Sequence, residues 1–366
     1  MICALALATV LAGAAPAAAS AQTAPVQLVQ LQPPPPAASG APGSIDPKAA
    51  TRAYLARQTP PEKARSDAYF EGGYWLDLWT FLWVAAAYFV LLHTGASAWM
   101  RDFAERLRSK PVQVAAYWVQ FLLAVTVMTL PLTVYRDFVR EHRYGLSNLT
   151  FGAWMGELGK GLAIAAILGS VAMIILYAVV RRLPRTWWLW GAVATIAFAV
   201  FFVVIVPVAI VPVFNNPKRL EDQRVVAPIL SLARANGIDA SNVWEVDASK
   251  QSKRISANVS GFLGTERITL NDNLLNRASL PEIEAVMGHE MGHYVLNHIY
   301  KFLVQLGIVV VIGFALLKLV FERLRIRNAR WQVRGVGDPA GLPLGALLLT
   351  SYLFVLTPAL NTLIRE

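Results

Sequence analysis

Long apolar runs alternate with short charged segments over most of this chain. Six runs have the length or hydropathy of membrane helices, since a helix needs about 20 apolar residues to cross a bilayer. They cover residues 76–98, 112–134, 162–180, 187–211, 302–320 and 342–356, the last being short enough to be tilted and partly buried. Because the fourth run opens with a tryptophan cluster typical of a bilayer interface, the pattern predicts a polytopic membrane helix bundle.

The residues before the first run divide into two segments. Residues 1–21 are rich in Ala and Leu and end in Ala19-Ser20-Ala21, a pattern typical of a signal-peptide cleavage site. Since a basic start is missing, the interpretation is a signal peptide or an uncleaved anchor. Residues 22–72 are interpreted as a linker and a polar N-terminal segment, with disorder expected for the Pro-rich stretch at 22–50.

Composition agrees with a membrane protein. Hydrophobic residues make up 56% and charged residues 15% of the 366 positions, whereas soluble domains average about 25% charged. The net charge of +10 includes Arg/Lys-rich loops at residues 101–110, 181–185 and 323–334, next to apolar runs, which favours a role in membrane topology over nucleic-acid binding. The one cysteine, Cys3, excludes an intrachain disulfide and a zinc site built on cysteines.

Residues 214–300 change to a mixed polar pattern that predicts a small α+β unit. Helical spacing over residues 225–236 stops at Gly237, and residues 243–246 and 267–270 are predicted to be short strands. A further helix is expected to begin after Ser279, because Glu282 three residues later completes a capping box and Pro281 suits the first turn. The fold class predicted is therefore mainly α, a membrane helix bundle with a small α+β domain.

That last helix carries the sequence His289-Glu290-Met291-Gly292-His293. Two histidines four residues apart lie on one helical face and can hold one metal ion at about 2.0–2.1 Å each. Glu290, one residue round, can take a proton from a metal-activated water and return it to the leaving amine. The motif predicts a zinc metalloendopeptidase with one Zn²⁺ per chain, His289 and His293 as metal ligands and Glu290 as catalytic base. Two ordinary helix histidines are the disfavoured alternative, since the helix is capped and follows strands.

A third zinc ligand is expected from elsewhere in the chain. His298 lies five residues after His293, and on an unbroken helix it would face well away, so it is expected to bond a carbonyl at the helix end. The remaining candidates are His93, His142 and a carboxylate.

Several stretches together resemble the CAAX prenyl protease 1 family of membrane zinc metallopeptidases. They are Phe138 to Leu146, Pro212-Val213-Phe214-Asn215, Asp247 to Ser252 with Gly261, Asn271 to Leu275, the metal helix and Asn297-His298. The resemblance covers residues 70–366 and implies a ring of membrane helices around a chamber that the zinc site faces. From the apolar runs and the metal helix, residues 73–213 are predicted to form a membrane domain with four helices and residues 214–366 a zinc metallopeptidase domain with two further membrane segments.

The resemblance also implies a glutamate as third ligand, within an E-x-x-x-D motif preceded by Asn and Arg. Asn361-Thr362-Leu363-Ile364-Arg365 is similar to that lead-in, so by family spacing the ligand would fall two residues past Glu366, as in a C-terminally truncated sequence. On the strand that aligns substrate, where the family often has Asn-Ala, this chain has Ser256-Ala257-Asn258.

The side of the membrane that the site faces has two opposing indications. The three Arg/Lys-rich loops alternate as expected if all are cytoplasmic, which places residues 214–300 outside. The resemblance implies a cytoplasmic catalytic side. A multi-pass protein of a bacterial inner membrane is predicted in either case.

The function predicted is hydrolysis of peptide bonds in peptide or membrane-protein substrates at the bilayer, CAAX prenyl protease-like. One alternative is a membrane quality-control protease similar to the HtpX group, and another is a non-catalytic membrane scaffold that retains the fold. The lipid bilayer is the expected surroundings; no nucleic acid is expected as a partner, and no feature identifies a protein partner.

Overall fold

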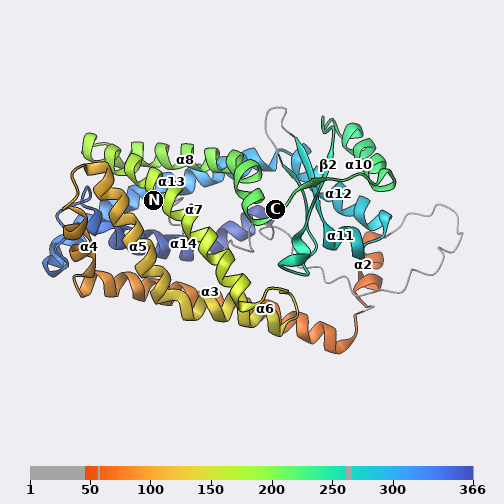
Figure 1. Ribbon diagram of the computed structural model, residues 1–366, viewed down its shortest axis with the longest axis horizontal. Helices are drawn as coiled ribbons and strands as arrows, with labels where there is room; N and C mark the ends of the chain where they lie inside the picture. The colour runs from red at the N-terminus through yellow and green to blue at the C-terminus, as the bar shows by residue number, and fades with distance from the viewer. Residues whose placement is uncertain (1–45, 57, 261–265, 366) are drawn as a thin grey trace, which may run out of the picture.

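The structure is a computed structural model that describes residues 46–56, 58–260 and 266–365. Long helices run side by side through one part of the molecule, and a small sheet with short helices lies at one end of them (Figure 1). The predicted class, a mainly helical membrane protein with a small α+β unit, is confirmed. The expected signal peptide or anchor at residues 1–21 lies outside the described residues.

Six helical stretches of the described chain are long and apolar enough to cross a membrane. They are α3 (Pro60–His93), α5 (Lys110–Thr133) with its continuation to Arg143, α7 (Phe151–Arg182), α8 (Trp187–Ile205), α13 (His298–Arg327) and α14 (Leu342–Arg365). Each of the six apolar runs lies wholly or largely within one of them, because a helix satisfies its own backbone hydrogen bonds in lipid.

The described part of the polar segment 22–72 is largely helical. It contains α2 (Pro47–Leu55) and the first turns of α3. The backbone N–H of Thr59 donates to the Glu62 carboxylate at 2.9 Å, which closes a capping box ahead of the apolar run. The start of the membrane helix is therefore set by this cap, more than ten residues before the hydropathy rises.

Short elements join the long helices. Proline interrupts two spans: the π-helical turn η2 (Val134–Val139) follows Pro131, and the π-helical turn η3 (Val206–Ile210) contains Pro207. A proline lacks the N–H that would continue the ladder, which loosens the helix there. The remaining connections are α4 (Ala96–Ala104), α6 (Arg140–Arg143), α9 (Val211–Phe214), η5 (Ala329–Trp331) and η6 (Pro339–Gly341).

The three Arg/Lys-rich loops meet at one end of the bundle. Arg101 forms an ion pair of 2.9 Å with Asp338, and both side chains are buried. Arg334 pairs with Glu105 at 2.7 Å, and Arg181 donates to the Gly337 carbonyl at 3.1 Å. These contacts bring the three loops together at one end of the bundle, and the sheet lies at the opposite end (Figure 1).

The sheet has four strands in the order β1-β2-β4-β3. Strands β2 and β4 are parallel, while β1 and β3 pair antiparallel with their neighbours. Two of these strands were predicted, and β1 and β3 were not assigned from the residue pattern. The bounds of this unit are β1 (Lys218–Arg219), α10 (Gln223–Ala235), β2 (Val243–Val246), η4 (Ala248–Lys250), β3 (Ala257–Ser260), β4 (Arg267–Asn271), α11 (Asp272–Arg277) and α12 (Leu280–Val295).

A close approach of α5 and α7 tests the packing of the bundle. Trp118 is 1% exposed and its indole N–H donates to the Ala165 carbonyl at 3.0 Å, so the ring is held in place. A Cβ on Gly169 would lie 2.5 Å from that ring.

We expect Gly169→Ala to destabilise the protein by about 1–3 kcal/mol, because overpacking a fixed aromatic ring forces strain. The measurement is thermal unfolding in detergent. Gly156→Ala on the same helix is the matched control, since its Cβ would meet nothing within 4 Å and alanine favours the helix. Equal unfolding temperatures for the two variants would show that this helix contact is looser than described.

Candidate active site

Helix α12 carries the three motif residues and is anchored at its start and along one face. The backbone N–H of Ser279 donates to the Glu282 carboxylate at 2.8 Å, so the predicted capping box is present. Ile283, Met287 and Met291 recur every four residues and are at most 2% exposed against the sheet core. The histidines, each two positions along from a buried methionine, therefore turn to the opposite face.

The two histidines converge on one point. Their Nε2 atoms are 3.0 Å apart, and the rings stand at 89° to each other. Two ligands at tetrahedral zinc distances would be separated by about 3.3 Å. The two Nε2 atoms could therefore bind a single zinc ion with little movement. The spacing of the histidines in the sequence predicts a shared helix face but not the orientation of the rings.

His298 lies against His293, which corrects the expectation that it faces away. Helix α12 ends at Val295, Asn297 adopts a left-handed conformation with φ of 57°, and α13 begins at His298. The turn brings the Nδ1 atoms of His293 and His298 to 2.6 Å from each other. The prediction failed because it assumed an unbroken helix, and Asn297, a residue type that tolerates this conformation, was the available signal.

Glu290 occupies the position expected of the base. Its side chain is partly buried beside the histidines. Burial raises the pKa of the Glu290 carboxyl above its ordinary value, and the nearby His289 and His293 oppose part of that shift. A raised pKa makes the carboxylate a better proton acceptor near neutral pH.

The third ligand is not found among the described residues, where no group of three His, Cys, Asp or Glu side chains is arranged so that it could hold a metal ion. His142 contacts the carbonyl oxygens of Phe138 and Leu149 with its two ring nitrogens, at 2.7 and 2.9 Å, so neither nitrogen is open to a metal. His93 ends α3 next to α4, at the far end of the bundle from α12 (Figure 1). Glu366 lies outside the described residues.

Strand β3 forms an open sheet edge beside the metal helix. It pairs with β4 on one side, and α12 packs against it. The Ser256 carbonyl accepts from the Asn271 backbone N–H at 3.0 Å. In an antiparallel pair the hydrogen-bonded residues alternate, so the backbone groups of Ser256 and Asn258 face β4. The backbone groups of Ala257 and Val259 consequently point to the free edge. Ser256-Ala257, expected from the resemblance on the substrate-aligning strand, lies at the start of this edge.

Comparisons with known proteins give a consistent result. Residues 50–216 match a family described as CAAX prenyl protease N-terminal, five membrane helices, and residues 219–366 match peptidase family M48. Four candidate spans lie in the described part of the first range. A crystal structure of Ste24p from S. mikatae shares the fold, with a TM-score of 0.62 at 24% identity over 82% of this chain and 70% of that chain.

Two relatives show how much of a longer protein is matched. The uncharacterized metalloprotease YhfN of Bacillus subtilis is 30% identical over 280 residues, 76% of this chain and 66% of that protein. CAAX prenyl protease 1 of Saccharomyces cerevisiae is 32% identical over 180 residues, 49% of this chain and 40% of the yeast protein. The chain thus spans less than two thirds of the length of either relative. None of these findings supports a signal peptide at residues 1–21. The metal helix and both halves of the chain place it in one group: the chain belongs to the CAAX prenyl protease family of M48 membrane metallopeptidases.

Proposed function

We propose that this protein is a membrane-embedded zinc endopeptidase whose catalytic helix is α12. The observation that carries the proposal is the convergence of the His289 and His293 Nε2 atoms, 3.0 Å apart, with Glu290 beside them. Membership of family M48, whose members typically bind zinc, supports the same metal. The non-catalytic scaffold is disfavoured because it gives no reason for two imidazoles to converge in this way.

The residues divide the reaction between them. His289 and His293 would hold one zinc ion, which when bound supplies a Lewis acid for the scissile carbonyl and lowers the pKa of its water ligand. Glu290 accepts the proton of the attacking water and passes it to the leaving amine. With the proton of His293 on Nδ1 and donated to Nδ1 of His298, the lone pair of the His293 Nε2 would stay directed toward the metal.

A peptide substrate is proposed to lie along β3. An extended chain adding to a free edge gains backbone hydrogen bonds without a sequence requirement, and Ala257 and Val259 present that edge next to α12. The surrounding bundle favours peptides and membrane proteins at the bilayer. The yeast relative carries the name CAAX prenyl protease 1, so a peptide ending in such a motif is one substrate to test against unfolded membrane protein.

We expect Glu290→Gln to keep zinc and lose activity. The variant retains both ligands but cannot accept a proton, so hydrolysis should fall by at least about 10²–10⁴-fold. Zinc per chain is measured by elemental analysis, and cleavage with a fluorogenic peptide, on this chain and on a form extended past Glu366. His289→Ala is the control that should lose zinc. If neither form of the wild type binds zinc, the assignment of the metal helix is wrong.

We expect His298→Ala to weaken zinc binding by about 10–100-fold, because partners that orient a metal-binding histidine contribute that much. Chelator competition measures the affinity. Lys301→Gln, an exposed change on the same helix, is the control. Unchanged affinity in His298→Ala would mean that His293 is oriented without this contact.

The site is proposed to face away from the cytoplasm of a bacterial cell. The three basic loops meet at the end opposite α12, and positive loops remain inside. We expect a cysteine at the exposed position Ser241 to react with a membrane-impermeant maleimide in intact spheroplasts, and a cysteine at Arg330 to react only after lysis, both in a Cys3→Ser background. The reverse pattern would place the site in the cytoplasm.

A further inference from the structure

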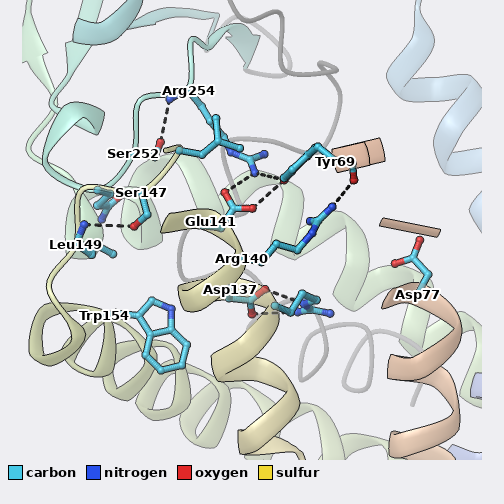
Figure 2. Close-up of a pocket in the computed structure, with 13 residues that line it drawn as sticks. Tyr69, Asp77, Asp137, Arg140, Glu141, Ser147, Leu149, Trp154, Ser252 and Arg254 are labelled. Atoms are coloured by element: carbon cyan, nitrogen blue, oxygen red, sulfur yellow. Dashed lines mark hydrogen bonds and ion pairs between the residues drawn. The ribbon is translucent and has the colours of Figure 1, made fainter. Parts of the chain in front are cut away.

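A charged cavity of about 260 Å³ lies where the membrane helices meet the catalytic unit (Figure 2). Its walls come from α3, from the end of the second span at η2 and α6, and from the segment just before β3. Six of the side chains that line it are Tyr69, Asp77, Arg136, Arg140, Glu141 and Arg254. Removing charged side chains from water is costly unless they are paired and hydrogen-bonded.

Arg254 spans this junction with its side chain. Its guanidinium donates to Glu141 at 2.6 Å and to the Tyr69 hydroxyl at 2.7 Å, and Tyr69 donates to the other Glu141 oxygen at 2.8 Å. Arg140 lies over the Tyr69 ring and donates to the Tyr69 carbonyl. The Arg254 and Glu141 side chains are only 24% and 16% exposed, so water screens their ion pair weakly.

The backbone of Arg254 is tied to the catalytic sheet. Its carbonyl oxygen accepts from the side-chain amides of Asn271 at 2.7 Å and Asn273 at 3.1 Å. Asn271 is the last residue of β4, and its side chain also caps α11 through the Leu274 N–H. One residue therefore joins the membrane helices to the strand that pairs with β3.

A loop of the membrane domain occupies the free edge just before β3. The Leu146 carbonyl accepts from the Lys253 N–H at 2.9 Å, and the Asn148 N–H donates to the Gln251 carbonyl at 3.0 Å, forming an antiparallel bridge. These groups lie on the side away from Asn271 and Asn273, to which the carbonyls of residues 252 and 254 turn. The edge is thus closed at Lys253, and no described residue forms a backbone hydrogen bond with its free side between Ile255 and Val259.

We propose that Arg254 and Glu141 are positioning residues through which the membrane domain sets the place of β3, and with it the register in which a substrate is cut. The proposal rests on the function proposed above, in which substrate pairs with β3. Arg254 stands three residues before Ala257, so a shift at the ion pair moves the start of the edge relative to His289. The loop at residues 146–148 already occupies the edge at Lys253, so a peptide bound along β3 cannot extend its pairing past that residue.

The test uses the full-length, zinc-loaded protein in detergent and one unstructured reference peptide. Arg254→Gln, Arg254→Lys, Glu141→Gln and the Arg254→Gln/Glu141→Gln double variant are compared by kcat, KM and the distribution of cut sites, read by mass spectrometry. We expect Arg254→Gln to raise KM about tenfold and to spread cleavage over neighbouring bonds, with zinc content unchanged. Arg254→Lys, which keeps the positive charge, should be intermediate. The double variant should be no worse than the worse single variant, as for residues that act as a unit.

Arg224→Gln is the matched control, because Arg224 forms an ion pair of 2.8 Å with Asp222 on the exposed surface of the same domain. It should leave KM and cut sites unchanged. If Arg254 and Glu141 variants lower the unfolding temperature but keep the wild-type KM and cut sites, the contact is structural only and the proposal is overturned. A wild type that holds no zinc and cuts nothing overturns the proposed function, and this inference falls with it.

Discussion

The packing of α12 against the small sheet is the constraint on which the site depends. Ile283, Met287 and Met291 are buried at every fourth position, so the helix has one orientation on the sheet. That orientation turns His289 and His293 away from the core. Because β3 is the edge strand of the described sheet and lies next to this helix, the same packing places the two proposed metal ligands beside a strand edge.

The membrane helices contact the small α+β unit at one end of the bundle, and at the other end their connecting loops contact one another. At the far end the buried Arg101–Asp338 pair locks the basic loops together. At the near end Arg254, Glu141 and Tyr69 connect the two domains. A sheet of four short strands buries a small core, so contacts with the membrane helices contribute what the catalytic unit lacks on its own.

Features set by local sequence were predictable, and features set by distant contacts were not. Apolar length located the six spans, and the Ser279–Glu282 capping box located the start of α12. The contact of His298 with His293 was missed because it depends on a left-handed Asn297, where the helix could equally have continued. Strand β3 was not predicted from its pattern because it contains Ala257 and Asn258, residue types that are uncommon in strands, and its place at the edge depends on the pairing of β4. The third ligand could be named only from resemblance.

The Arg254–Glu141 ion pair is a distant contact that could be suspected from the sequence. Glu141 lies at the end of an apolar span, and its side chain is only 16% exposed. Removing its charge from water costs free energy that a neutral residue at this position would not cost. A carboxylate retained there needs a cation from outside its own helix, and Arg254 of the other domain supplies it. Arg254 lies three residues before β3, so the carboxylate at the end of the second membrane span indicates, from sequence, where the strand proposed to bind substrate contacts the membrane helices.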